Sequence, residues 1–220
     1  MNKIQQEEKL IKKLEDLFCS ESSGHDLSHL TRTRNLAEHL QKKEGGDLEV
    51  IVLSALLHDI HRLIQKDTGK FCSPQDSLPQ VKKILTQVDV AEQTISKVLH
   101  CVEFHEEYGF SKNGKTVSDI ETLILQDADN LDAIGAIGIA RAFVFGGANN
   151  VPIWLPEIPF DRNEFDESEQ DPSEIHHFYA KLLKLKDNMN TKTARKMAAK
   201  RTDFMKIFLD RFFKEWNGEL

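Results

Sequence analysis

A histidine and an aspartate stand side by side, as His58 and Asp59, in a stretch of sequence that is otherwise apolar. The stretch runs from Leu48 to Ile64, and its length and its lack of turn residues predict a buried helix. An ionised carboxylate is rarely buried without a partner, because its desolvation costs several kcal/mol. Asp59 must therefore be neutralised by Arg62, by an imidazole from elsewhere, or by a metal cation that also uses the histidine.

Two further segments favour the metal cation. The segment GHDLSH opens a predicted helix, and its last residue, His29, comes 29 residues before His58. Downstream, the segment QDADNLD places three acids within six residues of an apolar, helical sequence, which packing does not explain. Imidazole and carboxylate ligands suit Mn, Fe, Co, Zn or Ni better than calcium, and an incomplete protein shell leaves positions for water and substrate. The polar residues of the two segments are His25, Asp26, His29, Asp127, Asp129 and Asp132.

The elements that must position these residues are predicted to be helical almost throughout. Apolar residues recur at three-to-four spacing, and nothing in the sequence is typical of a parallel sheet. Asp47 is the expected N-cap of the central helix, and Gly45 and Gly46 end the helix before it. The sequence therefore predicts an all-α bundle of about eight or nine helices. The main expected helices cover residues 4–18, 27–43, 48–64, 78–88, 91–106, 116–144, 173–187 and 191–216.

The 220 residues are expected to form a single helical domain. Its metal-binding core is expected within about residues 22–145, and C-terminal helices within residues 173–216. Between them, Ala148–Pro172 holds four of the six prolines and many acids, which predicts an ordered loop or lid that helps to close the site. Because a chain of this length buries a core without a structural metal, a metal site is expected to be catalytic.

Composition narrows the classes of partner. The net charge of -7 argues against a large nucleic acid but is compatible with a small phosphorylated substrate. Three cysteines, far apart and odd in number, predict a reducing compartment, and we expect the cytoplasm. The N-terminus is too polar for a signal peptide, and no apolar run is long enough to span a membrane. The sequence does not indicate the oligomeric state.

Four segments, spread over most of the chain, resemble those of the HD-domain superfamily of metal-dependent phosphohydrolases. The resemblance is closest to a bacterial subfamily of soluble HD hydrolases that includes nucleoside triphosphate pyrophosphohydrolases. An HD dipeptide alone would be a weak signal, whereas this ordered set is specific. The segments are GHDLSHLTR (24–32), ALLHDI (55–60), QDADNLDAIGAIGIARAF (126–143) and HFYAKLLKL (177–185).

The resemblance implies a divalent metal ion, Mn²⁺ first, with Mg²⁺, Co²⁺, Fe²⁺, Ni²⁺ or Zn²⁺ as alternatives. Its implied ligands are His29, His58, Asp59 and Asp129. Spacing alone would choose Asp127 as the last ligand, since Asp127 continues the apolar stripe of its helix. The family's last ligand is the aspartate in an Ala-Asp-x-Leu context, which is Asp129. Asp127 is then expected to lie behind the ligands and to orient one of them or a water.

Other candidates adjoin these segments. His61 follows His58 by three positions on the same helical face, and His105 matches a histidine of similar proteins, so both are candidate catalytic residues. A surface or structural role is the alternative for each. Candidate phosphate-binding residues are Arg32, Arg141 and Lys181, with salt bridges to local acids or a solvated helical face as the alternatives. The chain departs from the subfamily's usual Trp, Arg and carboxylate at Leu27, Asn130 and Arg62, respectively.

The predicted activity is metal-dependent hydrolysis of a phosphoester or phosphoanhydride in a small phosphorylated metabolite, most specifically a nucleotide. The sharpest form of this hypothesis is conversion of a (d)NTP to a (d)NMP and pyrophosphate. Two alternatives stay open. One is a nucleotidase or phosphodiesterase of the same superfamily, and the other is a non-catalytic module that binds metal or nucleotide and acts through a partner. Arg62 and Asn130 are the features that keep the second alternative open.

Overall fold

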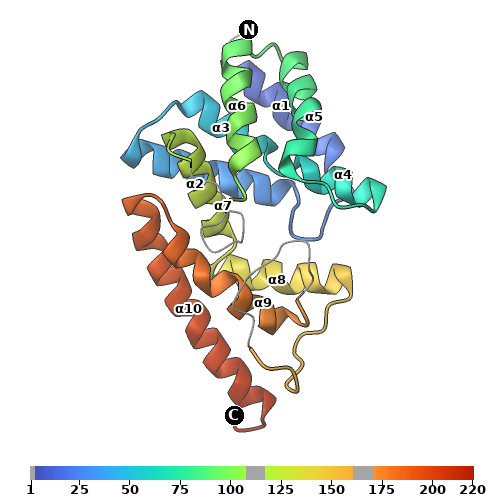
Figure 1. The fold of residues 1–220 in the computed structure, drawn as a ribbon, viewed down its shortest axis with the longest axis vertical. Helices are drawn as coiled ribbons and strands as arrows, with labels where there is room; N and C mark the ends of the chain where they lie inside the picture. Colours follow the sequence, from blue (N-terminus) through green and yellow to red (C-terminus); the bar gives the residue numbers. More distant parts are fainter. Residues whose placement is uncertain (1–2, 108–116, 161–170) are drawn as a thin grey trace.

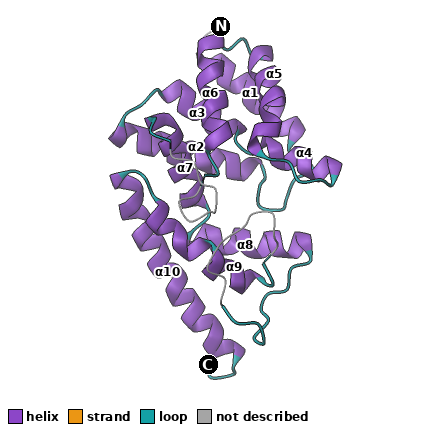
Figure 2. Ribbon diagram, viewed as in Figure 1, coloured by secondary structure: helices purple, strands orange, loops and turns teal. Residues whose placement is uncertain are grey.

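Helices form all the regular structure in the described part of the chain, which comprises residues 3–107, 117–160 and 171–220 of a computed structural model. Within these ranges there is no strand, so the predicted all-α fold class is confirmed (Figure 2). Ten α-helices and one 3-10 helix are present there. They are α1 (Lys3–Leu17), α2 (Leu27–Glu44), α3 (Leu48–Leu57), α4 (Ile60–Thr68), α5 (Pro74–Gln87), α6 (Glu92–Phe104), α7 (Ile120–Asp132), α8 (Gly135–Asn149), α9 (Glu174–Ala180), η1 (Leu182–Asn188) and α10 (Lys192–Trp216).

The helices are arranged around α3. It packs against α2, α6 and α7, while α2 also packs along α7. Figure 1 shows α1 to α6 at one end of the molecule and α8 to α10 at the other, with α7 leading from the first group to the second. The long α10 contacts α8, α7 and α2, and so joins the two groups. Within the described ranges no single helix is long and apolar enough to cross a membrane; the bent pair α7–α8 meets both criteria.

The predicted central helix is divided in two at the His58–Asp59 pair. As expected, α3 begins at the N-cap Asp47, whose side chain accepts a hydrogen bond from the backbone of Glu49, and it is buried from Val50 onwards. It ends at Leu57, however, and α4 starts at Ile60. The two helices differ in surroundings, since α3 is apolar on every side whereas α4 buries only one face. The chain must therefore turn as it leaves the core, and the turn falls on the candidate ligands.

A second predicted helix, residues 116–144, is also divided. Residue 116 lies outside the described residues, and the rest forms α7 and α8, which meet at an angle of 73°. Gly135 has a φ of 80°, and a Cβ on Gly138 would lie 2.2 Å from the carbonyl oxygen of Ala133. Glycine is therefore required at both positions, for a tight turn and close packing of the chain. As a result, the aspartates of QDADNLD lie at the C-terminal end of α7 and not in the middle of a helix.

Two other predicted boundaries shift for local reasons. Ser73 and Asp76 form a capping box, so α5 begins at Pro74 instead of near Leu78. The helix predicted over residues 173–187 is present as α9 followed by η1. Ser173 caps α9, and the predicted start of the last helix at Thr191 is confirmed by its capping of α10.

The expected lid, Ala148–Pro172, lies partly outside the described residues, since 161–170 are not among them. The described part contains no helix between Val151 and Phe160. It packs on α9, because the carbonyl oxygens of Pro152 and Ile153 accept hydrogen bonds from the backbone at the start of that helix. Trp154 stacks on Phe160 and His176 in the same region. A role in closing the site remains a prediction.

Asp127 has a structural role that differs from the expected one. Its two carboxylate oxygens accept hydrogen bonds from the backbone N–H groups of Asn190 and Thr191, each at 2.7 Å. The Asn190 side chain also donates to Asp127. Asp127 therefore fastens the start of α10 to α7, and the expectation that it orients a metal ligand is wrong. Its position on the apolar stripe of α7 gives it the buried place this role needs.

This contact gives a first prediction. Asp127→Asn should lower the free energy of unfolding by about 1–3 kcal/mol, because the amide cannot accept both backbone hydrogen bonds and leaves a buried N–H group unsatisfied. Chemical denaturation of the metal-free protein measures the change, and Mn²⁺ affinity of the folded variant should be unaltered. Asp203→Asn, at an exposed position on α10, is the control and should change neither. Loss of Mn²⁺ binding in Asp127→Asn without loss of stability would contradict this assignment.

Candidate metal centre

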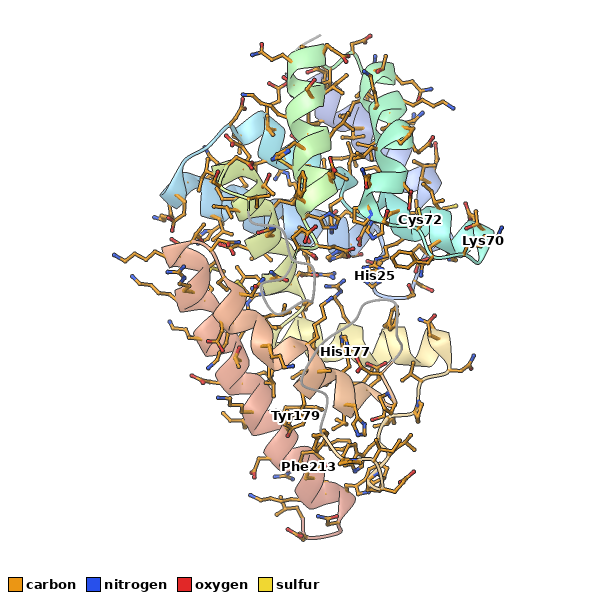
Figure 3. The ribbon with its side chains drawn as sticks, in the orientation of Figure 1. His25, Lys70, Cys72, His177, Tyr179 and Phe213 are labelled. Carbon is orange, nitrogen blue, oxygen red and sulfur yellow. The ribbon has the colours of Figure 1, made fainter. Side chains whose placement is uncertain are left out.

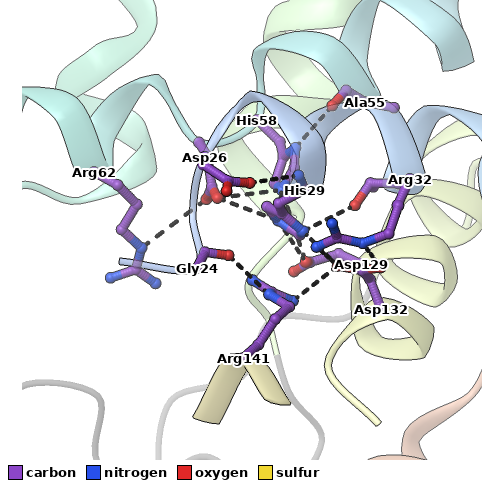
Figure 4. Close-up of polar contacts among 12 residues, drawn as sticks. Gly24, Asp26, His29, Arg32, Ala55, His58, Arg62, Asp129, Asp132 and Arg141 are labelled. Carbon is purple, nitrogen blue, oxygen red and sulfur yellow. Dashed lines mark hydrogen bonds and ion pairs between the residues drawn. The ribbon is translucent and has the colours of Figure 1, made fainter. Parts of the chain in front are cut away.

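Three elements bring the four implied metal ligands together. His29 lies in the first turn of α2, where the N-cap Asp26 accepts a hydrogen bond from the His29 backbone. His58 and Asp59 form the junction of α3 and α4, and Asp129 lies near the end of α7. Because α2 packs against both α3 and α7, these side chains are brought close together. Figure 4 shows His29, His58 and Asp129 side by side. Helix packing thus brings together residues that are far apart in the sequence.

The ligand atoms are spaced as they would be around one ion. Nε2 of His29 lies 3.2 Å from Oδ2 of Asp59 and 3.4 Å from Oδ1 of Asp129. Nε2 of His58 lies 3.7 Å from each of the same two oxygens. Ligands bonded to one transition metal at about 2.0–2.2 Å are themselves separated by about 3.0–3.6 Å. Each histidine nitrogen therefore lies near this spacing from both carboxylates, and His29, His58 and Asp59 offer three ligand atoms that all lie within 4.8 Å of one another.

The hydrogen bonds of the two histidines strengthen this fit. Nδ1 of His29 contacts Asp132 Oδ2 at 2.8 Å, and Nδ1 of His58 contacts the carbonyl oxygen of Ala55 at 2.9 Å. Both partners are acceptors, so in the neutral rings Nδ1 carries the hydrogen and Nε2 carries a lone pair. The two Nε2 atoms are 3.1 Å apart. Two nitrogens at this distance need a positive charge between them, either a metal cation or a proton on one of the rings.

The titration behaviour of the buried groups indicates the same need for positive charge. Burial lowers the pKa of His58, but Asp59 and Asp129 raise it, and the net result is a pKa of about 9. Burial raises the pKa of Asp59, yet the imidazoles of His58 and His29 hold it well below its usual range. Burial also raises the pKa of Asp129, but the hydrogen bond and the charge of His58 hold it well below its usual range. The carboxylates thus remain ionised and attract a cation.

Asp132 is the residue that orients the site, a role that the sequence analysis did not assign. Besides His29, it binds Arg32 through two contacts of 2.8 and 3.0 Å and Arg141 at 3.1 Å. Burial raises the pKa of Asp132, whereas hydrogen bonds with His29 and Arg32 lower it to about 2. The signal for this role was the spacing, because Asp132 follows Asp129 by three positions and so shares its helical face.

His61 and His105 are brought together on the other flank of Asp59. Nδ1 of His61 contacts the carbonyl oxygen of His58 at 3.0 Å, and Nδ1 of His105 contacts that of Val102 at 2.7 Å. Burial lowers the pKa of His105 to about 4, which keeps its ring neutral. Glu106, which the sequence analysis did not single out, lies between these histidines and Arg62, with which it forms an ion pair.

A cavity of about 360 Å³ is linked to the metal centre through Arg62, which lies 4.0 Å from Asp59, and Arg141, which lies 3.1 Å from Asp132. Arg62 and His25 line it on the side of the ligands, and Arg141, His177 and Lys181 line it from the second group of helices. Figure 3 shows His25 at the end of the first group of helices and His177 within the second. Of the three expected phosphate-binding residues, Arg141 and Lys181 therefore face the cavity. Arg32 does not line it and is held by Asp132 instead, as the salt-bridge alternative predicted.

The comparisons identify the family. The HD domain family model matches residues 26–134, and this range includes all four implied ligands. The chain belongs to the HD-domain family, whose members bind divalent metals. It is 34% identical to the uncharacterized protein YpgQ of Bacillus subtilis (strain 168) over 218 residues, which covers 99% of this chain and 97% of the relative.

Solved structures agree in fold over nearly the whole chain. An HD-superfamily hydrolase from Bacillus thuringiensis is 34% identical, with a TM-score of 0.72 and coverage of 98% of this chain and 99% of that one. The structure of Bacillus subtilis YpgQ in complex with ADP is 31% identical, with a TM-score of 0.75 and coverage of 98% and 97%. The helical fold and the family given by the sequence resemblance are confirmed.

A second prediction concerns how strongly Mn²⁺ binding depends on each of two acids of α7. Asp129→Asn should abolish stoichiometric retention of Mn²⁺ at this centre, because it removes a charged ligand. Asp132→Asn should weaken Mn²⁺ binding by about 10–100-fold, because His29 loses the carboxylate that fixes its ring. Titration of the metal-free variants with Mn²⁺ measures both. Asp67→Asn, at an exposed position on α4, is the control. Full retention of Mn²⁺ by Asp129→Asn would exclude Asp129 as a ligand.

Proposed function

We propose that this protein is a metal-dependent phosphohydrolase whose substrate is a small phosphorylated metabolite, specifically a nucleotide. The observation that carries the proposal is a group of ligand-type side chains that is connected to a cavity lined by cationic side chains, since Arg62 lines the cavity and lies 4.0 Å from Asp59. A nearby cavity favours a catalytic ion over a structural one, because it gives a ligand a place to bind. Membership of the HD-domain family and likeness to an HD-superfamily hydrolase support the hydrolytic class.

The proposed ligands are His29, His58, Asp59 and Asp129, and Mn²⁺ is the proposed ion, since mixed imidazole and carboxylate ligands suit it. When bound, such an ion supplies Lewis acidity, which polarises a phosphoryl oxygen and makes a water molecule more acidic. Asp132 keeps the His29 ring in its ligating tautomer. Burial lowers the pKa of His105 to about 4, so its neutral ring on the flank of Asp59 can accept a proton, and His61 lies beside it.

The cavity supplies the groups that bind phosphate. Arg62, Arg141 and Lys181 line it, and charge-assisted hydrogen bonds from such groups hold phosphate oxygens strongly. Arg141 is fixed in place, because its Nε donates to the carbonyl oxygen of Gly24 at 2.8 Å. The volume of about 360 Å³ falls in the range of small-molecule sites. The ADP complex of Bacillus subtilis YpgQ supports a nucleotide as the ligand here.

For the reaction itself, we propose cleavage of a nucleoside triphosphate between the α and β phosphates. Water attacks the α phosphorus, and the bond from this phosphorus to the oxygen that bridges the α and β phosphates breaks. The products are pyrophosphate and a nucleoside monophosphate. Arg141 and Lys181 offset the negative charge of the transferring and leaving groups. The likeness of residues 126–143 and 177–185 to the pyrophosphohydrolase branch of the family supports this choice over other phosphohydrolase reactions.

One observation favours a second candidate, a binding module without turnover. Arg62 occupies the position where several HD nucleotidases have a carboxylate that carries a proton, and a guanidinium does not exchange protons near pH 7. The two candidates differ in a single measurement, which is product formation by the metal-loaded protein.

The third prediction tests the reaction and the cavity together. With Mn²⁺ and a panel of dNTPs and NTPs, the products should be pyrophosphate and a monophosphate. Lys181→Ala should raise the KM by about 10-fold, because one charged hydrogen bond to phosphate is lost. Lys184→Ala, one helical turn away and outside the cavity, is the matched control and should keep the wild-type KM. Inorganic phosphate as the product would reassign the bond that is cleaved. No turnover on any nucleotide, with Mn²⁺ bound, would favour the binding module.

A further inference from the structure

Glu174 is a buried acid in the wall of the cavity, and the proposed reaction does not use it. It is the first residue of α9, only 3% of it is exposed, and it lines the cavity together with Asp171. Its Oε2 is buried and has no hydrogen-bond partner among the described residues. A buried polar atom without a partner costs free energy, so such an atom in a native structure points to a ligand or water that satisfies it.

Gly146 on α8 makes room for this carboxyl group. A Cβ at Gly146 would lie 2.5 Å from both Cγ and Oε1 of Glu174, which is closer than such atoms can approach. A Cβ at the neighbouring Gly147 would have nothing within 4 Å. The missing side chain at Gly146 therefore lets the carboxyl group lie directly against α8, whereas Gly147 has no part in this contact.

The ionised carboxyl group opposes folding. Burial and, to a lesser extent, the charge of Asp171 raise the pKa of Glu174 from its usual value of 4.5 to about 7. Since the folded chain holds this proton more tightly than the unfolded chain, the contribution of Glu174 to stability falls as the pH rises between these two values. An acid kept for the fold alone would be paired, as Asp171 is with His177 at 2.8 Å. Glu174 is instead placed for a hydrogen-bond donor that enters the cavity.

The charges of the cavity give a nucleotide one favourable direction. Arg141 lines the cavity beside Asp132, close to the metal centre. Glu174 lies against Gly146, which is five positions further along α8, or about 7.5 Å along the helix axis. Phosphates are attracted by the guanidinium and repelled by the carboxylates, so the base extends towards Glu174. Apolar side chains that can contact the faces of a base also line the cavity, namely Phe145, Val151 and Leu182.

We propose that Glu174 is a specificity-determining residue, whose carboxylate accepts a hydrogen bond from an exocyclic amino group on the base of the nucleotide. The inference rests on the proposed nucleotide substrate. Cytosine carries an N–H donor at the position where uracil and thymine carry an oxygen acceptor. A buried carboxylate that faces an oxygen acceptor stays unpaired and repels it, so the site should select cytosine over uracil.

The test is the affinity of full-length protein for CTP and UTP at about pH 8, where Glu174 is ionised. The wild type should bind CTP about 10–100 times more tightly than UTP, which is the effect of one hydrogen bond to a charged group. Glu174→Gln and Gly146→Ala should each lose this preference, because the first replaces the acceptor and the second displaces it. Calorimetric titration of the metal-free protein measures the affinities, and kcat/KM with Mn²⁺ should show the same preference.

Two control variants should keep the preference. Gly147→Ala adds the same methyl group one position away, and Glu92→Gln removes an exposed acid from the first position of α6. Circular dichroism of the variants separates loss of recognition from loss of the fold, and Gly146→Ala leaves the acid itself in place.

Equal affinity of the wild type for CTP and UTP would overturn the proposal, as would an unchanged preference in Glu174→Gln. An equal loss of affinity for both nucleotides in Glu174→Gln would also overturn it, and would place the carboxylate at the ribose that they share. The outcomes separate this inference from the proposed function. Pyrophosphate release without a preference for CTP would refute the inference alone, and a preference in binding without turnover would refute the reaction alone.

Discussion

The structure depends on holding Nε2 of His29 and Nε2 of His58 only 3.1 Å apart. A positive charge must accompany this contact, either a metal cation or the proton that His58 binds with a pKa of about 9, and the fold must bring the two rings together. It does so by packing α2 against α3, where Leu30, Ala37 and Leu40 are completely buried. Each fully buried leucine contributes about 1.5–3 kcal/mol, which is enough in sum to hold a polar cluster of this kind. The centre is thus prepared before any ion binds.

Asp132 links this centre to the cavity. The same carboxylate binds His29 on one side and the guanidinium groups of Arg32 and Arg141 on the other. Arg141 belongs to α8 and lines the cavity. The 73° bend between α7 and α8 therefore sets the position of Arg141 relative to the ligands. The glycines of the bend, Gly135 and Gly138, therefore contribute to the site although they touch no ligand. Their place in the sequence beside the aspartates follows from this geometry.

Much of this arrangement could be predicted from the sequence, because the strongest signals were local. The apolar run before His58 predicted a central helix, and the ordered segments predicted which side chains would meet. Breaks in helices were not predicted, since the turn at Asp59 follows from the need to leave the core and not from a glycine or proline there. The role of Asp127 was also out of reach, and the spacing between Asp129 and Asp132 did not show which side chain Asp132 would orient. Both are acids on the same helix, and only the packing of α10 and α2 decides that one fastens backbone and the other orients an imidazole.

Arg62 shows how a departure from a family pattern can be compensated from a distant element. The carboxylate that similar proteins have at this position is missing, but Glu106, at the end of α6, brings a carboxylate to the guanidinium and to His61. The flank of Asp59 therefore retains an acid, although it comes from another helix. With the acid on α6 and the base on α4, the local charge stays balanced. Arg62 also lines the cavity, where it can face a polyanion. Judged by its own residue alone, this position has lost its acid, whereas the pair of positions keeps one carboxylate and one basic side chain at the flank of Asp59.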